Sequence, residues 1–318
     1  MPDLSVGGQA VIEGVMMRST DRVSTAVRRA DGSIDVKNED FIPISKRKKL
    51  FGIPIVRGAI SFVEMLVVGI KSLNFSAEIA ARDIEIQEGK DPGDEKPSKS
   101  TSVMLVLTVV LALAISIAVF FYLPLQFASL LEVNRDALMF NLAAGAIRVL
   151  MFLGYVWAIS LFKDFKRIFQ YHGAEHKSIW AYESGKDLVP GEARKFTTRH
   201  PRCGTSFIMI VAIMAIIIYS ISDTIYAQIT GAPPVIHIRF LVHFSLLPLV
   251  AGGSYELLKL SGRKRDHAVT KFFTAPGLWL QALTTNEPSD DQLEVAIVAL
   301  KNSLRMEEMP VEATVENK

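Results

Sequence analysis

Two histidines four residues apart are the side chains of this sequence best placed to bind a metal ion. His172 and His176 flank Glu175 in the run Tyr171-His172-Gly173-Ala174-Glu175-His176-Lys177. On a helix, positions i and i+4 lie on one face, so both imidazoles can reach the same ion. His200 and Cys203, the chain's single cysteine, add nitrogen and sulfur donors of the kind that zinc prefers. We therefore predict a Zn²⁺ site formed by His172, His176, His200 and Cys203.

The number of ligands decides the chemistry of such a site. Four protein ligands make a closed tetrahedral structural site, whereas three leave a position for a water that can be activated for hydrolysis. The order H-x-x-E-H also occurs in one class of zinc protease. Glu175 is then the candidate catalytic acid and base, and its alternative is a surface carboxylate paired with Lys177. The sequence leaves both alternatives open.

Two further side chains are candidates for supporting the ligands. Glu183 follows His176 by seven residues, so it returns to the same helix face, where it either is itself a ligand or fixes the tautomer of an imidazole, and the second role ranks higher. Arg202, together with Lys177, is expected to favour the thiolate of Cys203. A cysteine nucleophile with a histidine base ranks below metal ligation, and a small buried hydrophobic role for the cysteine is the plain alternative.

Glu13 is a second candidate catalytic carboxylate. It lies in the glycine-punctuated run 7–18, which strand propensity alone does not explain. It either reaches the metal site as a ligand or base, or forms an ion pair with Arg18 or Arg22.

Long uncharged segments indicate a membrane protein. Half of the residues are hydrophobic and the mean hydropathy is positive, as is common in polytopic membrane proteins. We predict an α-helical polytopic membrane protein with about four transmembrane helices, two in 101–162 and two in 204–260, plus a small cytoplasmic α+β portion. The first uncharged run is longer than a bilayer crossing needs, and Pro124 is expected to mark where that helix leaves the membrane.

The distribution of basic residues predicts the orientation. Lysines and arginines crowd the 163–203 segment and also flank the first and last spans, whereas 223–238 contains none. Basic loops stay in the cytoplasm, so both termini and the 163–203 metal-site loop are expected there. No apolar core of a signal peptide is found in the first twenty residues. The lipid bilayer is the expected partner, and the net charge of +2 argues against nucleic acid.

The other segments are expected to complete the cytoplasmic portion. Residues 1–50 predict a β element with a hairpin turn at Asp31-Gly32. Residues 51–84 predict an interfacial helix or a re-entrant pair, and 85–100 a solvated linker. Residues 261–318 predict an interfacial segment and then a helix that opens with a capping box at Ser289.

Three polar residues fall inside the predicted spans. Arg148 is near the middle of the second span, and His243 and Glu256 lie in the fourth. A charge at this depth is costly and usually faces a partner or a water-filled cavity. We expect Arg148 to pair with His243 or Glu256 in a network that stabilises the bundle, with a polar cavity as the alternative.

Six segments together resemble the YqhQ-like family of bacterial membrane proteins, which are generally described as predicted metal-dependent enzymes. The matching segments are 7–18, 171–177, 181–183, 200–207, 251–256 and 275–281. The resemblance implies a multi-span protein of the bacterial cytoplasmic (inner) membrane and supports metal binding. It does not imply a particular reaction.

Three function classes follow. The first is a zinc-dependent hydrolase at the cytoplasmic face, acting on a lipid-linked or peptide substrate delivered from the membrane. The second is a non-enzymatic regulator or assembly factor with a structural metal and a membrane-protein partner. The third is a transporter, which Arg148 and His243 favour, and which the lack of an internal repeat disfavours.

Overall fold

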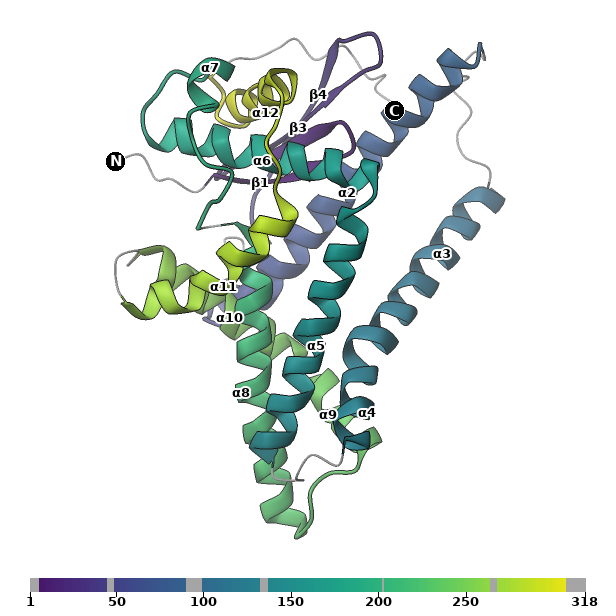
Figure 1. Cartoon of the computed structure of the whole chain (residues 1–318), viewed down its shortest axis with the longest axis vertical. Helices are drawn as coiled ribbons and strands as arrows, with labels where there is room; N and C mark the ends of the chain where they lie inside the picture. Colours follow the sequence, from purple (N-terminus) through teal and green to yellow (C-terminus); the bar gives the residue numbers. More distant parts are fainter. Residues whose placement is uncertain are drawn as a thin grey trace.

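The protein consists of a small α+β unit stacked on a bundle of apolar helices (Figure 1). The computed structural model describes residues 6–44, 49–89, 99–131, 137–201, 203–263 and 268–306. Most of the expected 85–100 linker and the last residues of the expected C-terminal segment therefore lie outside the described residues, as does Arg202.

The N-terminal segment forms a four-stranded antiparallel sheet in the order β1-β2-β3-β4. The strands are β1 (Gly7–Val11), β2 (Gly14–Arg18), β3 (Arg22–Arg28) and β4 (Ile34–Asp40). The Asp31-Gly32 turn is confirmed: Gly32 has a φ of 89°, and the Asp31 carboxylate accepts the Ser33 N–H at 2.9 Å. The segment before it folds back at Ile12-Glu13 into a further hairpin. The β element is therefore larger than the single hairpin and preceding strand that the sequence indicated.

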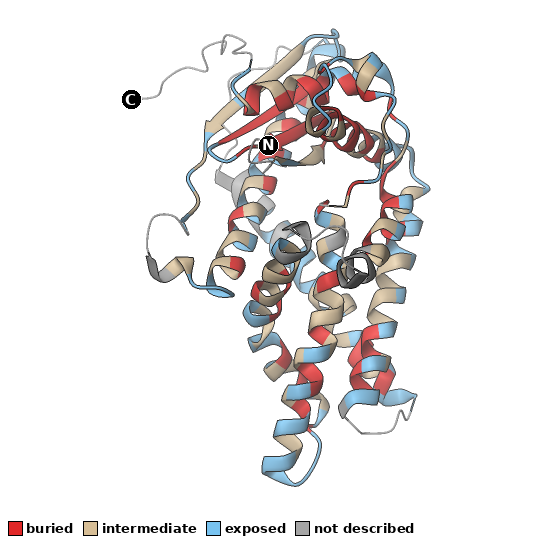
Figure 2. Cartoon of the chain, turned by 90° about the vertical axis from the view of Figure 1, so that its left-hand side faces the viewer, coloured by how far each residue is buried: buried red, intermediate tan, exposed pale blue. Residues whose placement is uncertain are grey.

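Helices cover both faces of this sheet, so its two central strands, β2 and β3, are largely buried (Figure 2). Because strand side chains alternate, Val15 and Ala26 pack toward α6 and α12, whereas Met16 and Val27 pack toward α2. The helices of this unit are η1 (Lys49–Gly52), α2 (Val56–Gln87), α6 (Lys163–Glu183), α7 (Pro190–Ala193) and α12 (Asp290–Ser303). The expected capping box opens α12, with Ser289 and Gln292 bonded to each other's backbone N–H.

Helix α2 connects the sheet to the bundle. It is one unbroken helix, not a re-entrant pair. It crosses α10 closely, since a Cβ on Gly252 would lie 2.3 Å from the Ile55 carbonyl oxygen. Arg57 and Glu256 pair across the same crossing, with Nε–Oε1 at 2.6 Å.

Within the described residues, three helical segments are long and apolar enough to span a membrane, or up to four if a bent pair of helices forms one span. The three are Val110–Leu130, Leu138–Ser160 and Phe207–Thr230, and the pair is Ile236–Ser245 with Leu247–Lys259. The helices of the bundle are α3 (Lys99–Ile117), the π-helical turn η2 (Ala118–Tyr122), α4 (Leu123–Leu130), α5 (Ala137–Ser160), α8 (Gly204–Thr230), α9 (Ile236–Ser245), α10 (Leu247–Arg263) and α11 (Ala268–Thr284).

Two prolines shape these segments in ways that differ from the sequence prediction. Pro124 does not end the first span, because it follows the π-helical turn η2 inside the apolar stretch. Pro248 lies just past the junction of α9 and α10, where the pair bends by 50°. Since Pro248 has no N–H for the carbonyl four residues earlier, a straight fourth span is disfavoured at this point.

Candidate metal centre

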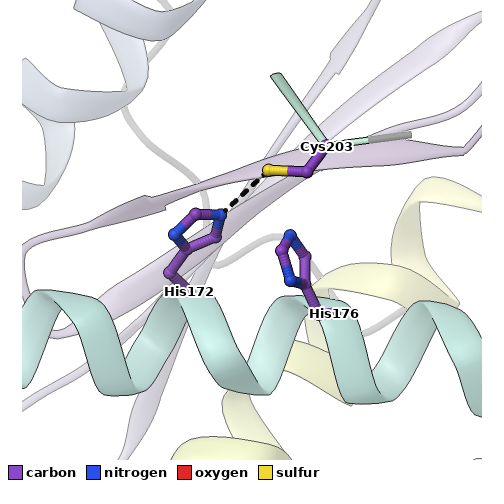
Figure 3. A group of neighbouring side chains, drawn as sticks. All are labelled: His172, His176 and Cys203. Atoms are coloured by element: carbon purple, nitrogen blue, oxygen red, sulfur yellow. Dashed lines mark hydrogen bonds between the residues drawn. The ribbon is translucent and has the colours of Figure 1, made fainter. Parts of the chain in front are cut away.

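Three of the four predicted ligands converge where the α+β unit meets the bundle. His172 and His176 project from α6 toward Cys203, which immediately precedes α8 (Figure 3). One donor atom from each of the three residues lies within 4.8 Å of the other two. In a tetrahedral zinc site, bond lengths of about 2.0–2.3 Å place ligand atoms about 3.3–3.7 Å apart. The group could therefore hold a metal ion with small side-chain adjustments.

Hydrogen bonds fix both imidazoles in the tautomer that metal binding requires. His172 Nδ1 lies 2.7 Å from the Thr284 carbonyl oxygen, and His176 Nδ1 bonds to the Thr198 carbonyl oxygen. A carbonyl only accepts, so each Nδ1 carries the proton and each Nε2 presents a lone pair. Metal-binding histidines are typically held by the same arrangement. Burial also lowers the pKa of His176, which keeps its ring neutral.

The Nε2 atoms and the sulfur face one another. His172 Nε2 is 3.2 Å from Cys203 Sγ, whereas His176 Nε2 is buried and has no hydrogen-bond partner in the described part of the chain. The sulfur also accepts from the Thr205 backbone N–H at 3.4 Å as the N-cap of α8. A helix N-terminus favours negative charge, so this position suits a thiolate ligand.

His200 lies beside the centre but outside the converging group. Its Nε2 is 3.4 Å from Glu183 Oε1, and both side chains are buried. Glu183 therefore lies against the imidazole of His200, and its role in fixing a tautomer stays a prediction. Gln281 of α11, which sequence reasoning gave no role, exchanges two hydrogen bonds with the His200 backbone, at 2.8 and 2.9 Å. This clamp holds the turn that carries Cys203 against α11.

Glu175 is buried next to the histidine pair. Burial raises the pKa of its carboxyl group, while His172, His200 and the Gly8 N–H oppose that rise. Gly8 of β1 lies directly against it, because a Cβ on this glycine would be 3.0 Å from the Glu175 carboxyl carbon. This contact explains one glycine of the unusual N-terminal run.

Glu13 belongs to a different contact. Its carboxylate forms a two-point ion pair with Arg167 and lies 3.3 Å from the Tyr171 hydroxyl. Glu13 was expected to pair with Arg18 or Arg22, but these contacts are with Arg167 and Tyr171. A φ of 51° at Glu13 in the β1–β2 turn places the side chain on α6.

Lys177 does not act on the thiol as predicted. Its ammonium group is buried and donates to the Arg194 carbonyl oxygen at 2.9 Å and to Glu287 at 2.5 Å. The lysine therefore fastens α6 to the segment before α12.

The polar residues of the spans pair differently from the prediction. Glu256 binds Arg57 of α2, and Arg148 donates from Nε to the Phe120 carbonyl oxygen at 2.9 Å. His243 bonds Asp223 at 3.0 Å.

Asp223 is the centre of a buried cluster that the sequence did not indicate. Besides contacting His243, it forms an ion pair with Arg239 and accepts a hydrogen bond from the Asn141 amide, each at 2.9 Å. The His243 ring stacks on Tyr219 with centroids 4.0 Å apart. The cluster joins α5, α8 and α9 within the bundle.

Comparison with known proteins identifies relatives over nearly the whole chain. The family model described as "Protein of unknown function (DUF1385)" matches residues 53–306. A protein of Bacillus subtilis strain 168, "Uncharacterized protein YqhQ", is 37% identical over 311 residues, covering 95% of this chain and 92% of its own. No solved structure matches. The resemblance to the YqhQ-like family is thereby confirmed.

Proposed function

The chain belongs to the DUF1385 family, and we propose that it is a membrane-embedded zinc-dependent hydrolase with its site at the cytoplasmic face. One observation carries the proposal: both imidazoles donate Nδ1–H to backbone carbonyls and direct Nε2 toward a single cysteine sulfur. A neutral His₂Cys set suits zinc, and three protein ligands leave a fourth position open.

The surroundings of the open position favour catalysis. His172 is the least buried of the three residues, which favours access to the centre from its side. A zinc ion held there would act as a Lewis acid and lower the pKa of a water molecule. Glu175, whose carboxyl pKa is raised, would take the proton at its carboxylate and return it to the leaving group. The Gly8 N–H would hold this carboxylate in place.

Position relative to the bilayer suggests the substrate. Cys203 precedes the span at Phe207 by four residues, which is about 6 Å along a helix. The site would therefore lie at the cytoplasmic surface of the bacterial inner membrane, with both termini on that side, as the basic segments favour. A lipid-linked or peptide substrate could reach it from the bilayer.

A structural metal in a non-enzymatic membrane factor is the second candidate. The arrangement that favours it is the linkage of α6 to the start of α8, because a metal there would tie the α+β unit to the bundle. The two candidates make opposite predictions for one carboxylate.

Glu175→Gln separates them. A bacterium lacking its own copy would be complemented with wild type, Glu175→Gln or Cys203→Ser, and its lipids and peptides would be profiled. For a hydrolase, Glu175→Gln keeps zinc and abundance yet accumulates the same unprocessed species as the deletion strain. A stable, zinc-loaded Glu175→Gln protein that restores the wild-type profile would refute the hydrolase. For a structural metal, only Cys203→Ser, of the two variants, lowers both the zinc content and the abundance of the protein.

A further inference from the structure

Arg148 has one structural role that the neighbouring backbone explains. Pro124 lacks the N–H that would reach the Phe120 carbonyl four residues earlier, and Arg148 Nε donates to that oxygen instead at 2.9 Å. The guanidinium carbon also lies 5.1 Å from the centre of the Phe121 ring. The hydrogen bond uses the Nε–H edge of the guanidinium, and the Phe121 ring lies against one of its faces.

The remaining edge is without a partner. Arg148 Nη2 is buried and makes no hydrogen bond with any described residue, and no described acidic side chain forms an ion pair with Arg148. Asp223 and Glu256, two acids of the bundle helices, are each paired with another arginine. An uncompensated cation near the middle of an apolar span is costly, and such residues usually face a ligand or a polar path.

A cavity of about 210 Å³ adjoins this group. Its walls come from η2, α5, α8 and α10, and apart from Arg148 and Tyr219 they are apolar, with Phe120 and Phe121 on one side and Ala215 and Val250 among the others. The volume is smaller than the roughly 300–1,000 Å³ of typical ligand pockets, which suits part of a single chain. None of these residues belongs to the metal centre.

We propose that this cavity binds the carboxylate of a single-chain amphiphile, a free fatty acid, with the acyl chain along the apolar walls. A guanidinium recognises a carboxylate through parallel N–H···O bonds, and the low dielectric of the bundle strengthens them. Phe120 and Phe121 of η2 form one wall of the cavity, and α3, which runs into η2, leans away from α5 along the rest of its length (Figure 1). The inference is independent of hydrolysis at the metal centre.

Binding of three probes to detergent-purified full-length protein tests the proposal. The probes are oleate, methyl oleate and oleoyl lysophosphatidic acid, which share a chain and differ in the head. We expect oleate to bind at least about tenfold more tightly than methyl oleate, since a charge-assisted pair is lost in the ester. Equal binding of acid and ester would overturn the proposal, and tighter binding of the phosphate would overturn the carboxylate assignment.

Variants locate the site. Arg148→Gln alone leaves the Phe120 carbonyl without a donor, so the substitution is also made with Pro124→Ala, which restores a backbone N–H. Pro124→Ala should bind oleate as wild type does, and the double variant should lose about tenfold or more. Arg82→Gln, an exposed arginine of α2, is the matched control and should bind normally. Undiminished oleate affinity in the double variant would refute the site, and if that variant does not fold, the acid–ester comparison decides.

Discussion

Asp223 holds the only carboxylate in the buried cluster of the bundle among the residues described, so its charge can be removed selectively. Asp223→Asn keeps the shape of the side chain but leaves the Arg239 guanidinium, which is 4% exposed, without its counter-ion. Breaking a buried ion pair by neutralising one partner typically costs about 3–5 kcal/mol. The Arg239 guanidinium also lies over the Phe140 ring at 3.6 Å, and such a cation–π contact contributes about 0.5–2 kcal/mol. This contact is present in both proteins, so it does not offset the loss of the ion pair. The full loss should therefore appear.

Thermal unfolding in detergent, followed by tryptophan fluorescence, measures this loss. At roughly 2–4 °C per kcal/mol, Asp223→Asn should lower the Tm by about 6–20 °C. The exposed Asp187→Asn makes the same chemical change and should leave the Tm almost unchanged. Adding Arg239→Gln should recover part of the loss, because the double variant has no unpaired charge. A Tm within about 2 °C of wild type for Asp223→Asn, or strict additivity of the two substitutions, would refute the assignment of an energetically coupled pair.

Three further outcomes follow from close contacts and burial. Gly252→Leu should lower the Tm and expose α2 to limited proteolysis, because even a Cβ there lies 2.3 Å from the Ile55 carbonyl oxygen; an unchanged digestion pattern would contradict the tight crossing. Gly173→Ala places a Cβ 2.1 Å from the Asn286 carbonyl oxygen, so it should displace the segment whose Thr284 carbonyl holds His172 and should reduce the zinc bound per chain. Glu175→Gln should raise the Tm of chelator-treated protein at pH 7, and the gain should shrink toward pH 4.5. The folded state holds the Glu175 proton above its ordinary pKa of 4.5, so the wild type loses stability as pH rises; a gain independent of pH would contradict this sign.

The local features of the fold were readable from the sequence because they depend on neighbouring residues. Uncharged runs predicted the apolar helices, Asp31-Gly32 predicted a hairpin turn, and Ser289 with Gln292 predicted a capped helix; the structure contains all three. The prediction for Pro124 was wrong for a physical reason. A π-helical turn precedes the proline, and Arg148 of another helix donates to the Phe120 carbonyl oxygen that the proline cannot reach with an N–H; neither feature is visible in the local sequence.

The candidate site was predictable only as far as helical spacing reaches. The i, i+4 spacing placed His172 and His176 together, and a lone nearby cysteine completed the set. The separation of His200 from that set depends on Gln281, more than eighty residues away, which clamps its backbone. The predicted partners of the charged residues in the spans were wrong for the same reason, because helix packing decides which side chains meet.

Metal analysis by plasma mass spectrometry, after purification without chelators, tests the central claim most directly. It compares wild type with the His172→Ala/His176→Ala double variant and with His237→Ala, an exposed histidine of α9, as the matched control. The account predicts about one zinc per chain in wild type and in His237→Ala, and loss of the metal in the double variant. A wild type without metal, or a double variant that retains it, would contradict the metal centre.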